Sequence, residues 1–196
     1  MKRVGKLLAV AALPVIVMVA FIWSGVYNIA ATKPHSNLTT WLLAKARDRS
    51  IAFHSKEITL PPMTDPKFID VGFHHYHPMC RLCHGAPGYS PAEFADGLYP
   101  RPPLLLSEDL QRRPDAELYW IIRNGIKMTG MPSFGMTHDS EELLALLAFL
   151  RRVPRLTALL FGTNRWHRLT TSRISSAPIR SPTERMAPLK WGERRS

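Results

Sequence analysis

The chain has 196 residues, a formal net charge of +11 at pH 7 and only two cysteines. Its length leaves room for one domain together with a membrane anchor and a tail. Two cysteines exclude a structural zinc site built from cysteine alone, which needs four ligands.

Residues 1–31 are predicted to form an uncleaved transmembrane helix. A short basic stretch precedes about 25 residues, from Leu7 to Ala31, that carry no charged side chain. This is long enough to cross the roughly 30 Å hydrocarbon core of a bilayer as a helix. Trp23 and Tyr27 lie near its outer end, where amphipathic aromatic side chains favour the membrane interface.

The alternative to an anchor is a cleaved signal peptide, for which Ile29-Ala30-Ala31 is the nearest cleavage site. Both interpretations keep the basic end in the cytoplasm and export the rest of the chain.

Residues 32–64 are predicted to be a connector. The segment Leu38–Ala46 has the composition of a short amphipathic helix that lies near a membrane surface. A domain over residues 65–155 follows. Its first helix is expected to start after Asp65, a good N-cap residue, with Pro66 at the first helical position.

The rest of the domain is predicted to be helical, with no strand pattern, which makes the fold all-α. Residues 85–114 are rich in Gly and Pro and are expected to form a loop. A helix over 115–124 should end at Gly125. A last helix should start at Asp139, whose spacing to Glu142 is that of a capping box, and should stop at Pro154.

The stretch Cys80-Arg81-Leu82-Cys83-His84 contains both cysteines, and its C-x-x-C-H pattern is typical of covalent c-type haem attachment. Two thiols on one helical turn can reach the two vinyl groups of one porphyrin. The histidine that follows can then give a neutral imidazole nitrogen to the iron. The alternatives are a redox-active pair, a disulfide, or a zinc site completed by histidines 74, 75 and 77.

A second iron ligand is predicted at Met131. A methionine opposite a histidine is the arrangement of cytochromes c that transfer electrons. Met131 lies between Gly130 and Pro132, in a segment that cannot be regular helix or strand. Such a loop can pass close to a flat ring. Met128, three residues earlier, is the alternative ligand.

Together these residues resemble a class I c-type cytochrome domain. The resemblance includes the attachment motif, the Gly-Met-Pro loop, and Gly72 and Tyr76, which in the family pack against the last helix. The runs MCRLCHGAPG, GLYP and NGIKMTGMPSFG are similar to a subgroup of membrane-anchored bacterial monohaem cytochromes. The resemblance covers about residues 65–153.

The resemblance implies one covalently attached haem c, with Cys80 and Cys83 as attachment sites and His84 and Met131 as the metal ligands. It also implies a bacterial inner-membrane protein whose haem domain faces the periplasm and carries electrons between a donor and an acceptor. A six-coordinate iron has no open site, so no enzyme activity is expected. The alternatives are a cytochrome subunit of a dehydrogenase or oxidase complex and, in another class, a haem-based sensor.

Residues 156–196 are predicted to be a disordered basic tail. From residue 151 onward there are eleven Lys or Arg and two acidic residues, which gives +9 of the total +11. The tail is expected to be simply solvated, to contact anionic lipid, or to dock an acidic redox partner. Nucleic acid is not an expected partner of an exported haem domain.

Several other side chains near the motif have weaker assignments. Histidines 74, 75 and 77 are expected to be exposed or to lie at the haem edge, because they precede His84 on the same side of the ring. Any of three arginines could pair with a haem propionate: Arg101, Arg112 and Arg123.

Overall fold

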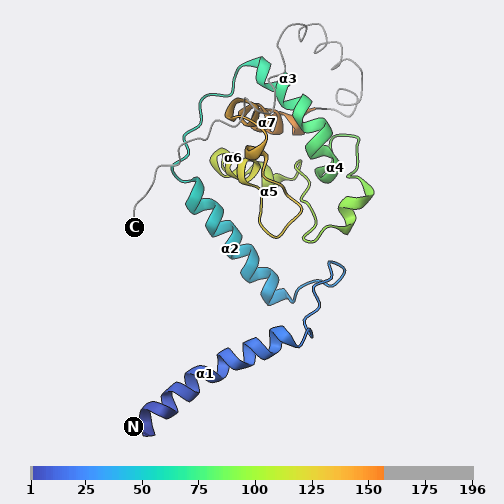
Figure 1. Cartoon of the computed structure of the whole chain (residues 1–196). Coiled ribbons are helices and arrows are strands. Elements are labelled where there is room, and N and C mark those ends of the chain that lie inside the picture. Colours follow the sequence, from blue (N-terminus) through green and yellow to red (C-terminus); the bar gives the residue numbers. More distant parts are fainter. Residues whose placement is uncertain (1, 157–196) are drawn as a thin grey trace.

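The computed structural model describes residues 2–156, and this part of the chain is helical without β-strands. Its elements follow one another from an N-terminal helix, α1, through α2 to a domain that contains α3 to α7 (Figure 1). The all-α prediction is confirmed for this range. The predicted tail lies outside the described residues, apart from Leu156.

Helix α1 spans Lys2–Trp23 and is shorter than the predicted span to Ala31. The helix stops because Gly25 has a left-handed backbone with φ of +64°. Among residues 2–156, no helix meets the length and hydropathy of a membrane span. Figure 1 shows α1 apart from the other helices.

Helix α2 spans Asn37–Ser55, about twice the length predicted for the connector helix. Its N-cap is Ser36, whose side chain accepts a hydrogen bond from the N–H of Thr39. The second half of α2 buries Ile51 and Ser55 against helix α6 (Asp115–Asn124). The polar sequence after Ala46 is therefore helical because it docks on the domain, which its own pattern did not predict.

Helix α3 spans Pro66–His75 with Asp65 as its N-cap, as predicted. It does not run on regularly to the cysteines, because a π-helical turn, Tyr76–Cys80, follows and leads into α4 (Arg81–His84). Pro78 lies in this turn and has no N–H to donate to the fourth preceding carbonyl. The N–H of Arg81 instead bonds the carbonyl of Tyr76, five residues back.

The predicted loop over residues 85–114 contains two short helical segments, a 3₁₀ turn Glu93–Gly97 and α5 (Glu108–Gln111). Both begin with acidic side chains, which stabilise a helix N-terminus. The remainder is loop. The helix predicted over 115–124 is confirmed as α6, and Gly125 ends it with φ of +66°.

Helix α7 spans Ser140–Arg152 and starts with the predicted capping box of Asp139 and Glu142. Pro154 stops it, within a 3₁₀ turn Val153–Arg155. Its apolar face packs against α3 and α6 (Figure 1). The buried core that results consists of Phe73, Tyr76, Ala86, Leu118, Tyr119, Leu143, Leu146, Leu147, Phe149, Leu150 and Val153.

Candidate functional site

The crossing of α3 and α7 places the cysteine motif. A Cβ built at Gly72 would lie 2.1 Å from the carbonyl oxygen of Ala145 and 2.6 Å from the Cβ of Phe149. Only glycine allows the two helix backbones to approach so closely. The predicted contact of Gly72 and Tyr76 with the last helix is confirmed, since the ring of Tyr76 also lies against Phe149.

Tyr76 also fixes the end of the motif. It is 1% exposed, and its hydroxyl donates a hydrogen bond to the carbonyl of Gly85 at 2.8 Å. Burial raises the pKa of Tyr76, so the hydroxyl stays a donor. Gly85 itself has φ of +71°, which turns the chain sharply after His84. The motif is therefore held at both ends, by α3 and by this turn.

Both cysteines are half-buried free thiols. Burial, and then the neighbouring Cys83, raises the pKa of Cys80 to about 12. A thiol with so high a pKa stays protonated near pH 7 and is a poor thiolate nucleophile. Within residues 2–156 no group of three His, Cys, Asp or Glu is arranged to hold a metal ion. The part of the chain that the structure describes therefore gives no support to the zinc interpretation.

His84 has a fixed tautomer. Its Nδ1 lies 2.7 Å from the carbonyl oxygen of Pro103, and because a carbonyl only accepts, Nδ1 carries the proton. Burial lowers the pKa of His84, although the hydrogen bond to Pro103 opposes this shift. The imidazole is therefore neutral near pH 7, with a lone pair on Nε2. This is the state in which histidine ligates a metal.

Met131 lies in the loop between α6 and α7. Hydrogen bonds within this loop hold it together. The N–H of Met131 donates to Thr129 Oγ1 at 3.1 Å, and the Thr129 hydroxyl donates to the carbonyl of Ile126 at 2.7 Å. The N–H of Ile126 in turn donates to the carbonyl of Met131 at 3.2 Å. The residue is thus fixed in position without regular secondary structure.

The alternative ligand, Met128, lies in a different environment. It is 92% exposed and adopts φ of +62°, whereas Met131 is half-buried. A Cβ added at Gly130 would contact Leu98, at 3.0 Å from Cδ1, so the Met131 loop packs against the loop that leads to Pro103. Met131 and Met128 therefore differ in burial and in backbone conformation, and Met131 as the thioether ligand stays a prediction.

The residues present fit a haem group. The donor set combines two thiols on one helical segment, an imidazole with a free Nε2 and a fixed thioether. Apolar side chains beside His84 are also exposed, with Leu104 at 56% and Leu106 at 36%. Exposed leucines of this kind suit an apolar ring that covers them.

The other predicted side chains have contacts of their own, and His74 lies against Phe73. His74 is exposed, and His77 is half-buried against Phe73. His75 contacts the ring of His138 at 4.9 Å between centroids. Of the three arginines, Arg101 pairs with Asp96, Arg112 pairs with Glu108, and Arg123 donates to the Tyr119 hydroxyl at 3.4 Å.

Three residues that position the site were not predicted from the sequence: Pro103, Thr129 and Gly85. Pro103 acts through its carbonyl, and its partner lies 19 positions away in the chain. A backbone acceptor has no sequence signal. Thr129 is three residues from Ile126 and two from Met131, so a turn analysis of this loop could have found it.

A family model described as cytochrome c oxidase, cbb3-type, subunit III, matches residues 68–150. This range contains the cysteine motif, His84, Pro103 and the Met131 loop. A comparison with curated proteins finds no match.

Proposed function

We propose that this protein is a membrane-anchored monohaem cytochrome c of class I that carries single electrons, and the family match over residues 68–150 supports this proposal. Cys80 and Cys83 would hold the haem covalently, and His84 and Met131 would be its two iron ligands. A bound haem supplies the one-electron chemistry. The chain binds and orients it.

The observation that supports this proposal is that each of the two candidate ligands, His84 and Met131, is fixed by hydrogen bonds of its own. His84 presents Nε2 because Pro103 holds its Nδ1–H. Met131 is fixed by Thr129 and Ile126 in a separate loop. With both residues as ligands, the iron would have no open position for a substrate, so the domain would carry electrons rather than act as a catalyst.

Membrane anchoring and a periplasmic location are part of the proposal. Leu7–Ala31 carries no charged residue, and the apolar side chains of the second half of α1 are exposed, with Ile22 at 69% and Trp23 at 85%. Such a surface is costly in water. In the producing bacterium, the full chain should stay in the membrane fraction after an alkaline carbonate wash. A variant without residues 2–31 should be soluble.

A second candidate function is that of a cytochrome subunit in an oxidase complex. The description of the matched family as an oxidase subunit favours it. Its distinguishing result is co-purification, in mild detergent, with a separate chain that reduces oxygen. Purification as a lone chain that exchanges electrons with soluble redox proteins supports the free carrier instead.

Carbon monoxide tests the carrier role against a haem-based sensor or oxygen-reacting site. Reduced protein, purified in detergent with its haem, is exposed to carbon monoxide and its visible spectrum is recorded. A carrier with both ligands in place should show no spectral change. A prompt shift to a carbonyl-bound spectrum would establish an open or displaceable site and contradict the proposal.

A further inference from the structure

One face of α2 is docked on the haem domain. Its inward residues follow helical spacing, and among them Ile51 is 2% exposed and Ser55 is 3% exposed. The ring of His54 stacks on Trp120 of α6, with centroids 5.8 Å apart and planes 12° apart. The second half of α2 is therefore part of the domain and not a loose linker.

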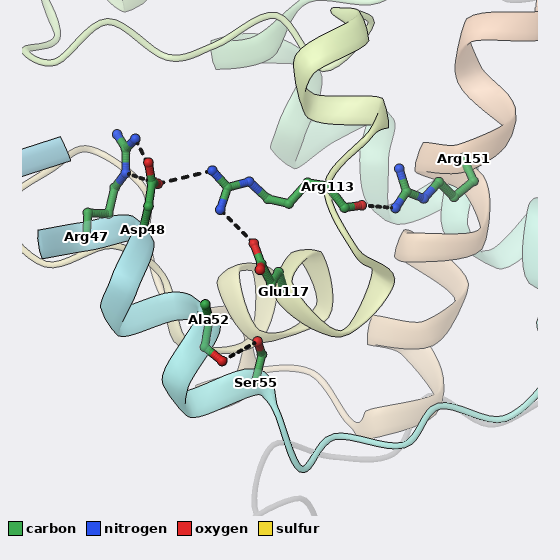
Figure 2. Close-up of polar contacts among 7 residues, drawn as sticks. All are labelled: Arg47, Asp48, Ala52, Ser55, Arg113, Glu117 and Arg151. Atoms are coloured by element: carbon green, nitrogen blue, oxygen red, sulfur yellow. Dashed lines mark hydrogen bonds and ion pairs between the residues drawn. The ribbon is translucent and has the colours of Figure 1, made fainter. Parts of the chain in front are cut away.

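An ionic clamp strengthens this docking (Figure 2). Arg113 reaches Asp48 of α2 at 3.1 Å and Glu117 of α6 at 2.8 Å. Arg151 of α7 donates to the carbonyl of Arg113 and lies 2.7 Å from Asp115. Because Arg113 is only 24% exposed, this network is worth more than a surface ion pair.

No other part of residues 2–156 covers the opposite face of α2. The residues at positions 38, 42, 45, 49 and 53 follow one another by three or four, so they form one stripe along the helix. Three of them are apolar and exposed: Leu38 at 66%, Leu42 at 51% and Phe53 at 62%. The other two are the exposed cations Lys45 and Arg49. We call these five residues the outer stripe.

The charge around the outer stripe is one-sided. Residues 1–47 contain no Asp or Glu. The first acidic residue of the chain, Asp48, points to the domain, where it pairs with Arg113. Trp41, beside the stripe, is 56% exposed. Exposed apolar side chains, an exposed tryptophan and exposed cations favour contact with an anionic lipid surface.

From this arrangement we infer that the outer stripe of α2 binds an anionic phospholipid surface while the opposite face holds the haem domain. The inference rests on the membrane anchoring proposed above. Because α2 is clamped to α6 and α7, the domain would keep one orientation on the membrane instead of swinging on a linker. That orientation determines which haem edge a membrane-bound donor can approach.

The test uses the full chain with its haem, reconstituted in vesicles of phosphatidylcholine alone or mixed with phosphatidylglycerol. Hydrogen exchange of the amides of residues 37–50 is followed by mass spectrometry, with α6 as an internal reference. We expect slower exchange over 37–50 in the anionic vesicles and no change in α6.

Two matched variants separate specific contact from net charge. Lys45→Gln with Arg49→Gln removes two cations from the outer stripe, and the lipid-dependent protection should fall by up to about 30-fold, the factor for two interfacial cations. Lys67→Gln with Arg112→Gln removes two exposed cations elsewhere and should leave the protection unchanged. Visible spectra of both variants confirm that the domain is folded.

The outcomes distinguish this inference from the anchoring on which it rests. If the chain is released from vesicles by carbonate, the anchoring fails. If it stays in the bilayer but exchange over 37–50 is the same in both lipids, the outer stripe does not bind anionic lipid. Protection that appears only in native membranes, and not in pure lipid, would assign the stripe to a protein partner and overturn the inference.

Discussion

The Nδ1–H of His84 donates a hydrogen bond to the carbonyl of Pro103 at 2.7 Å, and this contact determines which nitrogen of the ring is free. Burial lowers the pKa of the same imidazole, so it is neutral near pH 7 without any further partner. A loop proline thereby sets the chemistry of a histidine on α4. The second proposed ligand, Met131, is instead fixed by several hydrogen bonds within its loop.

The first prediction compares the two methionines of that loop. Met131→Ala removes the half-buried thioether, so the reduced protein should bind carbon monoxide and lose its low-spin visible spectrum. Met128→Ala changes a side chain that is 92% exposed and should leave both properties unchanged. The reverse result would assign the ligand to Met128.

A second prediction concerns the crossing of α3 and α7. Gly72→Ala places a Cβ 2.1 Å from the carbonyl oxygen of Ala145, and we expect a loss of about 1–3 kcal/mol of unfolding free energy or more. Gly97→Ala is the matched control, because a Cβ there meets nothing within 4 Å. Denaturant unfolding of the holoprotein measures both. Equal stabilities would show that the helices can separate at little cost.

The third prediction compares neighbouring arginines. Arg113→Gln leaves Asp48 and Glu117 without their common partner and should cost about 1–3 kcal/mol. Arg112→Gln breaks only an exposed pair with Glu108 and should cost about 0–1 kcal/mol. Thermal unfolding by circular dichroism compares the two. An equal loss of stability in both variants would mean that the contacts of Arg113 with α2 and α6 add no stability.

The fourth prediction is a pH dependence. Burial alone would raise the pKa of Asp48, but the hydrogen bonds from Arg113 and Arg47 outweigh it and hold this pKa below 3.8. The stability that Asp48 contributes is therefore complete above its unfolded pKa and is lost as the pH falls through the lower folded pKa. At pH 7 the Asp48→Asn variant should have a lower melting temperature than the wild type. In strong acid the two melting temperatures should be equal. A difference that is constant with pH would contradict this.

Local signals were sufficient for much of the fold. Asp65 and Asp139 are side-chain caps that act within three residues, and Gly125 stops α6 through its own backbone. The pattern Cys80–His84 is also visible from its spacing alone, and its role in haem attachment stays a prediction. Elements that depend on distant partners could not be predicted in this way. Helix α2 extends to Ser55 because Asp48 and Ile51 contact the domain. Pro103 contacts His84 from a loop that is distant in the sequence.

The π-helical turn before the cysteines illustrates an intermediate case. Pro78 is visible in the sequence, and a proline inside a helix removes one hydrogen bond. Whether the helix then kinks, ends or widens depends on what surrounds it. Here Tyr76 is buried against Phe149, and its hydroxyl bonds the carbonyl of Gly85. The helix keeps both contacts by forming a π-helical turn, in which hydrogen bonds join residues five apart instead of four.

The most direct measurement is a visible spectrum of the full chain, produced with cytochrome c maturation, before and after denaturation, alongside a Cys80→Ala/Cys83→Ala variant. The account predicts that denatured wild-type protein retains its haem and that the folded, reduced form is low-spin. The double variant should release its haem on denaturation. Wild-type protein that carries no covalent haem would contradict the assignment of Cys80, Cys83 and His84, and with it the proposed function.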